Sequence, residues 1–110
     1  MGGKMKKIDK LVEKKKAGEL VSLTQDKQAE VRYAAVEALG KVGGEDAYNA
    51  LIPLVHNADV ELRKRAILAL GEVGFADARV HIIHQMNKET NEQVQEAIKQ
   101  ALHKLPEDKD

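Results

Sequence analysis

The chain has 110 residues, enough for one domain with a sizeable core. Its 18 basic and 18 acidic residues cancel, which excludes a global field that attracts nucleic acid or an anionic membrane. The lack of cysteine excludes disulfides and thiolate sites and suits a reducing compartment, so we expect a cytoplasmic protein.

Residues 5–16 predict a short amphipathic helix. Its apolar residues recur at helical spacing: Met5, Ile8, Leu11 and Val12. The first sixteen residues contain seven lysines, and we interpret the helix as a solvated cap over one end of the fold. The alternative is a basic surface for an acidic partner or nucleic acid, which the lack of arginine and aromatic side chains weakens.

Residues 17–43 predict the first pair of helices. A short apolar helix at 19–24 precedes a turn, and a second helix follows from about 29 to 42. Gly40 inside this helix costs roughly 1 kcal/mol relative to alanine. Because a glycine recurs at the equivalent position, Gly71, we expect a neighbouring backbone to pass too close for a side chain. Gly43 is expected to end the helix.

Residues 44–74 predict the second pair. Pro53 lies inside the first helix of this pair and removes a backbone donor, so we expect a kink centred near Asn49. Asp59 is expected to cap the second helix, at 60–73.

Residues 75–105 predict the third pair. The first helix, at 77–87, is expected to turn four apolar side chains inward: Ala78, Ile82, Ile83 and Met86. Thr90 with Gln93 fits a capping box for the last helix, at 92–105. This helix is more polar than the corresponding helices at 29–42 and 60–73, as expected of a terminal cap, and 106–110 form a short tail.

The segment VRYAAVEALGKVG at 31–43 returns as LRKRAILALGEVG at 62–74, an offset of 31 residues. Seven positions are identical in the two copies: Arg32/Arg63, Ala35/Ala66, Ala38/Ala69, Leu39/Leu70, Gly40/Gly71, Val42/Val73 and Gly43/Gly74. Repeats of this length usually build stacked helical units.

These two segments, each preceded by an apolar helix and a short turn, resemble the HEAT repeat, in particular the short subtype of phycobilisome lyase HEAT-like proteins. The resemblance covers 17–105. It implies an all-α fold: a right-handed α-α superhelix of about three helix pairs plus the N-terminal cap, in one domain over 1–110. The helix that carries the motif would line the concave side.

The resemblance also implies a ladder in which a turn aspartate pairs with the motif arginine six residues later. Asp26 and Arg32 match this pattern. Arg63 follows Asn57, so it is left with a weaker hydrogen bond or with Asp26 as an alternative partner. Gln95 replaces the arginine in the third unit, and the ladder is expected to stop there. We interpret Asp26, Arg32 and Arg63 as structural.

The sequence contains few signs of catalytic chemistry. His81 and His84 are three residues apart on one helix, but a metal site needs a third ligand, so we interpret them as surface histidines. The one serine, Ser22, has no nearby histidine to activate it. No glycine-rich phosphate loop follows a strand, and no apolar run approaches the roughly 20 residues of a membrane span. We predict a protein that is not an enzyme and holds no cofactor or metal.

The predicted concave side carries three rows of side chains that face a partner: Tyr33, Lys64 and Glu96; Val36, Ile67 and Lys99; Glu37, Leu68 and Gln100. Val36, Ile67 and Leu68 are apolar where a solvated face would be polar. They form either a protein-binding groove or self-association surface, or a packing contact with adjacent helices. Tyr33 is of a residue type that is favoured at binding hot spots.

The predicted function is a scaffold or protein-interaction module that binds a protein of unknown identity on the concave helices. One alternative, implied by the resemblance, is an accessory subunit of a bilin lyase-type complex. Another is weak nucleic-acid binding through the lysine-rich N-terminus. We expect a monomer, or weak self-association, and no membrane partner.

Overall fold

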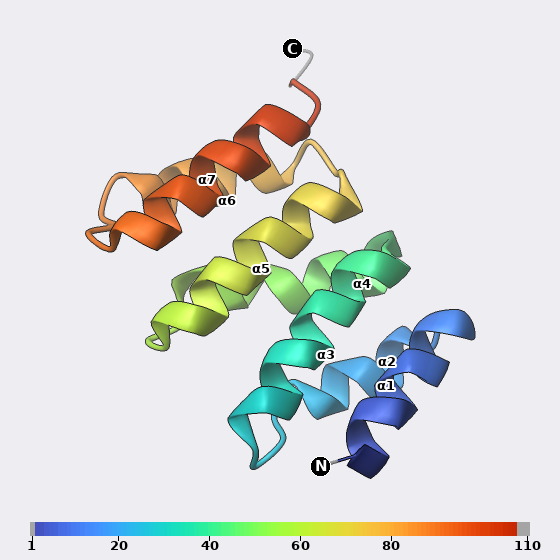
Figure 1. The fold of residues 1–110 in the computed structure, drawn as a ribbon. Coiled ribbons are helices and arrows are strands. Elements are labelled where there is room, and N and C mark those ends of the chain that lie inside the picture. Colours follow the sequence, from blue (N-terminus) through green and yellow to red (C-terminus); the bar gives the residue numbers. More distant parts are fainter. Residues whose placement is uncertain (1, 108–110) are drawn as a thin grey trace.

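The computed structural model describes residues 2–107, which are all-helical apart from their connecting turns (Figure 1). The elements, in chain order, are α1 (Gly2–Glu13), α2 (Ala17–Leu23), α3 (Ala29–Val42), α4 (Gly44–Leu51), the 3-10 helix η1 (Ile52–His56), α5 (Val60–Val73), α6 (Ala78–Met86) and α7 (Glu92–Lys104).

The helices form two layers. In one layer α1, α3, α5 and α7 lie side by side in that order (Figure 1), and each contacts the next. In the other layer, α2 contacts α4, and η1 contacts α6. The fold is therefore an α-α solenoid of three helix pairs with one additional helix at its N-terminal end. It measures 42 × 28 × 17 Å.

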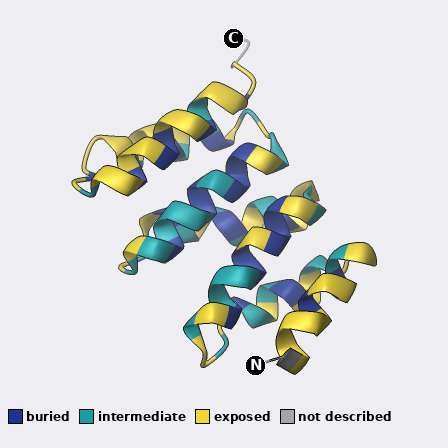
Figure 2. Cartoon of the chain, viewed as in Figure 1, coloured by how far each residue is buried: buried dark blue, intermediate teal, exposed yellow. Residues whose placement is uncertain are grey.

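The core lies between the two layers, and every α-helix contributes to it (Figure 2). The largest fully buried side chains include Leu20, Leu39, Leu51, Leu70, Ile82 and Ile98. The helices follow from the apolar stripe that each buries, since burial of such a stripe supplies most of the stability of short helices.

Two glycines set the distances between the helices that carry the repeated motif. A Cβ added at Gly40 would lie 3.0 Å from both Cα and Cβ of Ala69, and one at Gly71 would lie 3.2 Å from Cα of Ala101. The predicted packing reason for these glycines is confirmed, because a neighbouring helix backbone occupies the space of a side chain.

The prediction of a kink centred near Asn49 is wrong. Helix α4 stays regular to Leu51, and the chain then tightens into η1, with Pro53 in the first turn of η1. Proline lacks a backbone N–H and clashes with the preceding turn of an α-helix, so the α-helix ends just before it.

One predicted helix cap is confirmed and one is wrong. Asp59 accepts hydrogen bonds from the backbone N–H groups of Glu61 and Leu62, at 2.9 and 3.3 Å. The capping box at Thr90 does not form. Asn91 caps α7 instead, and its side chain accepts from the N–H of Gln93 at 2.9 Å.

The ends of the chain differ from the prediction in two details. The N-terminal helix begins at Gly2 rather than at residue 5. It ends at Glu13 rather than at residue 16, because Lys15 adopts a left-handed conformation with φ 54°. Part of the predicted tail at 106–110 lies outside the described residues.

Helix α6 packs differently from its predicted orientation. Ala78 and Ile82 point into the core as expected, but Ile83 and Met86 are exposed. Gln85 is buried in their place, because it takes part in the polar network described below.

Candidate protein-binding groove

A groove of about 840 Å³ crosses α3, α5 and α7. Its apolar floor includes Leu68, Ala69 and Ala101, and charged side chains from all three helices surround this floor. The remaining lining residues are Glu37, Lys41, Arg65, Glu72, Glu96, Lys99, Gln100, His103 and Lys104.

A smaller hollow of about 210 Å³ adjoins the groove between α5 and α7. It adds Lys64, Gln93 and Ala97 to the lining and shares Leu68, Glu96 and Gln100 with the groove. Leu68 lines both depressions, so this side chain is the apolar centre of the surface.

Ion pairs fix part of the groove wall. The guanidinium of Arg65 contacts Glu37 at 3.0 Å and Glu61 at 2.6 Å, and Lys104 pairs with Glu72. Exposed pairs of this kind add little stability, but they orient their side chains. Three of the lining groups take part in no ion pair within residues 2–107. They are Lys41, Glu96 and Lys99.

The structure brings together most of the residues that the sequence placed on the concave side. Five line the groove: Glu37, Leu68, Glu96, Lys99 and Gln100. Lys64 lines the adjoining hollow. Val36 and Ile67 are fully buried, so their expected place on a binding surface is wrong. The close approach of adjacent helices narrows the exposed arc of each helix and encloses both side chains.

Tyr33 connects two helix pairs rather than lining the groove. Its hydroxyl donates to Oδ2 of Asp59 at 2.7 Å, and the guanidinium of Arg65 lies 5.2 Å from the centre of its ring. The hydrogen bond raises the pKa of Tyr33 and lowers the pKa of Asp59.

The turns before α3, α5 and α7 share one hydrogen-bonding pattern. In each turn, a side chain two residues before the helix cap accepts from the N–H of the capping residue. The three bonds join Asp26 to Gln28 at 3.0 Å, Asn57 to Asp59 at 2.8 Å and Glu89 to Asn91 at 3.1 Å. The pattern fixes the entry of the chain into each helix of the groove.

The backbone carbonyl of the same turn residue accepts a second bond from the side chain six residues later. Arg32 donates to the carbonyl of Asp26 at 2.8 Å, Arg63 to that of Asn57 at 2.9 Å, and Gln95 to that of Glu89 at 2.8 Å. The amide of Gln95 therefore replaces the guanidinium in the third turn. This hydrogen bond to the turn carbonyl is present in all three turns, whereas the ladder was expected to end before the third.

The expected carboxylate ladder does not form. Arg32 contacts the carbonyl of Asp26, whereas the carboxylate of Asp26 pairs with Lys4 at 2.7 Å. Arg63 does not reach Asp26 either, because its ionic partner lies in the following turn. That partner is Glu89, which the sequence reasoning missed.

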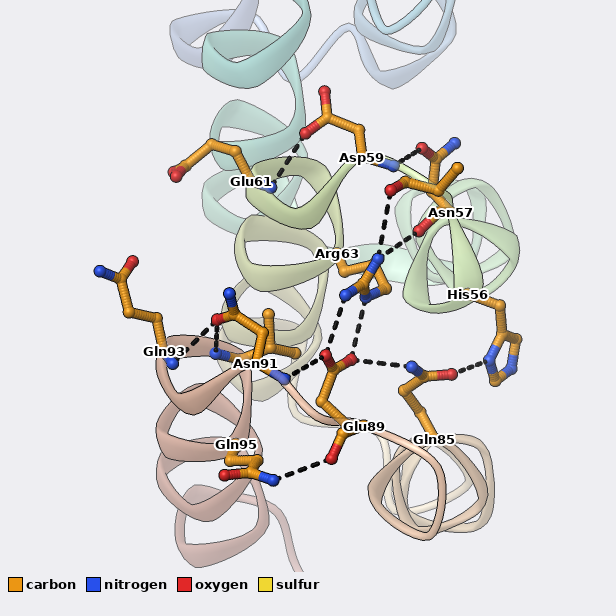
Figure 3. A network of polar contacts seen from close by, with 12 residues as sticks. His56, Asn57, Asp59, Glu61, Arg63, Gln85, Glu89, Asn91, Gln93 and Gln95 are labelled. Carbon is orange, nitrogen blue, oxygen red and sulfur yellow. Dashed lines mark hydrogen bonds and ion pairs between the residues drawn. The ribbon is translucent and has the colours of Figure 1, made fainter.

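Arg63 and Glu89 form a two-pronged ion pair between the second and third helix pairs (Figure 3). The N–O distances are 2.9 and 2.8 Å, and the side chain of Glu89 is only 1% exposed. Gln85 donates to the same carboxylate at 2.8 Å and accepts from Nδ1 of His56, 2.7 Å away. The hydrogen bonds from Arg63 are the main reason that the pKa of Glu89 falls from 4.5 to about 2.

Residues 17–103 match the family of HEAT repeats. The chain belongs to the HEAT repeat family. This membership confirms the predicted resemblance, while the phycobilisome lyase subtype stays a prediction. A search of curated proteins finds no match.

The histidines of this HEAT chain form no metal cluster in the part that the structure describes. No group of three or more His, Cys, Asp or Glu side chains there is arranged to hold an ion. His84 instead meets the ring of His56 edge-on, with the ring centres 5.7 Å apart. Among the same residues, no helix is long and apolar enough to cross a membrane.

Proposed function

We propose that this HEAT protein is a non-enzymatic module that binds a protein partner in the groove across α3, α5 and α7. HEAT repeats commonly serve as scaffolds for protein interactions. The observation that carries the proposal is the groove itself: an apolar floor centred on Leu68 and surrounded by charged side chains from three helices.

The charges of the groove favour a polypeptide as its occupant. Carboxylates of Glu37, Glu72 and Glu96 line it together with the basic side chains. A nucleic acid would meet repulsion from the carboxylates, whereas a polypeptide can present apolar anchors with charges of both signs. Roles in a bilin lyase complex and in nucleic-acid binding stay predictions, as does a cytoplasmic location.

A comparative pull-down tests the proposal, with the full chain as bait and Leu68→Arg as the groove variant. The matched control is Ser22→Arg, which adds the same side chain at an exposed position of α2, in the other layer. Proteins that bind the groove are captured by the wild type and by Ser22→Arg, and are lost with Leu68→Arg.

Circular dichroism of each bait establishes that the variants are folded. Capture of the same proteins in equal amounts by all three folded baits would overturn the groove as the binding site.

A further inference from the structure

The charges of the chain are divided unequally between its first helix and the rest of the molecule. Residues 1–16 contain seven lysines against Asp9 and Glu13, a formal charge of +5. The chain as a whole is neutral, so residues 17–110 carry −5. The expectation of no membrane partner rested on the overall balance, which does not reflect the basic region at α1 and the turn after it.

Six of the seven lysines take part in no ion pair within residues 2–107. Lys4 pairs with Asp26 at 2.7 Å. The other six are all exposed, and we call them the lysine cluster: Lys6, Lys7, Lys10, Lys14, Lys15 and Lys16.

The helical part of the lysine cluster points away from the core. Helix α1 buries Ile8 and Leu11 against the other helices, and Figure 2 shows most of the remaining helix as exposed. At 3.6 residues per turn, three lysines share an arc of about 100° on the side away from these two apolar residues: Lys6, Lys7 and Lys10. The cluster therefore presents its ammonium groups outward.

The lysine cluster does not serve the stability of α1. Like charges four residues apart, such as Lys6 and Lys10, weaken a helix. A helix that served only as a cap would gain from carboxylates in its first turn, and α1 has none there. Burial of unpaired ammonium groups under a further helix would be costly. The cluster is therefore suited to contact with an anionic partner.

We propose that the lysine cluster binds the surface of an anionic phospholipid membrane. This surface is separate from the groove, and the proposal does not depend on the proposed function. A cluster of about four to eight lysines on an amphipathic helix is typical of binding to anionic lipids. Each lysine near such a surface raises the affinity about fivefold, so the six together raise it about 10⁴-fold. Because α1 buries its apolar side in the core, the contact is electrostatic and does not enter the hydrocarbon.

The geometry of α1 favours a flat surface over a nucleic acid. Helical spacing places Asp9 and Glu13 on the arc next to Lys6. A helix in the major groove of DNA has phosphates along both flanks, and these carboxylates would be repelled there, whereas a flat membrane contacts only the outer arc. Residues 1–16 also contain no arginine to pair with a phosphate through two bonds and no aromatic ring to stack on a base.

The mobility of lipids favours a membrane over an acidic protein. The ammonium of lysine is a hydrated point charge on a flexible stem, without a fixed direction. Lipid headgroups diffuse within the membrane and can gather under each ammonium. A folded protein must instead hold its carboxylates in matching positions, and exposed ion pairs of this kind contribute little.

Cosedimentation of the full chain with lipid vesicles tests the proposal. The wild type is expected to sediment with vesicles of phosphatidylcholine that contain about one-third phosphatidylglycerol, and not with pure phosphatidylcholine. Binding in about 0.1 M NaCl should be lost in about 0.5 M NaCl, because salt screens exposed charges.

Two triple variants locate the contact. Replacement of Lys6, Lys7 and Lys10 by glutamine is expected to weaken vesicle binding about 100-fold, at about fivefold for each lysine. The matched control removes the same charge from three lysines outside α1 that also lack an ion pair, and it keeps the binding: Lys41→Gln, Lys88→Gln and Lys99→Gln. Equal vesicle binding by the two variants, or no binding by the wild type, would overturn the proposal.

Two further measurements separate the membrane from other roles of the cluster. In urea unfolding, the α1 variant is expected to be at least as stable as the wild type, because repulsion along the helix decreases. A loss of stability would assign the lysines to the fold instead. At the same ionic strength, the wild type is expected to bind a DNA duplex and poly-glutamate more weakly than the vesicles. Tighter binding of either polyanion would contradict the membrane as the partner.

Discussion

The contact between the first and second helix pairs, which we call the first joint, differs from the contact between the second and third pairs, the second joint. In the first joint the backbones approach most closely, with a Cβ at Gly40 placed 3.0 Å from Ala69. The polar links there are the hydrogen bond from Tyr33 to Asp59 and the exposed ion pair between Arg65 and Glu37. The first joint therefore depends mainly on the fit between α3 and α5.

The second joint is looser between the helices and stronger at the turn. A Cβ at Gly71 would lie 3.2 Å from Cα of Ala101, slightly farther than at the first joint. The turn is held by the ion pair of Arg63 and Glu89, in which the carboxylate side chain is only 1% exposed and the arginine side chain 14% exposed. The repeated glycines and alanines thus set the helix spacing, and the positions that differ between copies decide how each joint is closed.

Replacement of the two equivalent arginines, Arg32 and Arg63, is expected to reveal the largest difference in stability between the two joints. Arg63→Met should lower the free energy of unfolding by about 3–5 kcal/mol, because it leaves the buried carboxylate of Glu89 without its cation. Arg32→Met should cost only about 1 kcal/mol, because Arg32 bonds two backbone carbonyls at the edge of a turn. Urea unfolding of the two variants measures both values.

The double variant Arg63→Met with Glu89→Gln provides the control. This variant lacks both the guanidinium of Arg63 and the negative charge of Glu89, so no charge is left buried without a partner. It should recover much of the stability that Arg63→Met loses. Equal losses for Arg63→Met and Arg32→Met would show that the two joints are closed in the same way.

Acid is expected to weaken the second joint through Glu89. The pKa of this carboxyl is about 2 in the folded chain and 4.5 in its ordinary state, so the unfolded chain binds the proton more readily. The ion pair therefore stabilises the fold above about pH 4.5, and this stabilisation is lost as the pH falls toward 2. The difference corresponds to about 3 kcal/mol.

Unfolding by urea at several pH values between 6 and 2, in the wild type and in Glu89→Gln, isolates this contribution. The difference in stability between the two proteins should shrink as the pH falls. A constant difference across that range would mean that Glu89 does not carry the acid sensitivity of the joint.

The sequence predicted the fold well because the repeat determines it. A shared offset of 31 residues identified the stacked pairs, and the helices α3 and α5 lie where their apolar stripes placed them. Glycine within a helix carries a cost, so its recurrence at Gly40 and Gly71 predicted the close approach that the structure contains.

The groove was predicted less completely, because exposure depends on the distance between helices. Val36 and Ile67 belong to the same helices as the groove residues, and only the approach of the neighbouring helices determines that they are buried. Glu89 was missed because the third turn is one residue longer, which moves Glu89 out of the offset of 31 residues that relates Asp26 to Asn57. A glutamate two residues before Asn91, in the place of Asp26 and Asn57, was the available signal.

The two repeated glycines offer the finest test of the difference between the joints. Alanine gains about 1 kcal/mol over glycine inside a helix, and a clash in a packed interface costs about 1–3 kcal/mol. At Gly40 the added Cβ would meet Cα and Cβ of Ala69 at 3.0 Å, and main-chain atoms yield poorly. Gly40→Ala is therefore expected to lose about 1–2 kcal/mol, measured by urea unfolding.

Gly71→Ala is the matched comparison. Its Cβ would meet Cα of Ala101 at 3.2 Å and Cβ at 3.4 Å, so a shift of a few tenths of an ångström relieves the contact. The gain in helix propensity should then offset most of the strain and leave the stability within about 0.5 kcal/mol of the wild type. A loss as large as that of Gly40→Ala would mean that the second joint is as rigid as the first. Its ion pair would then add to a close fit between α5 and α7 rather than replace it.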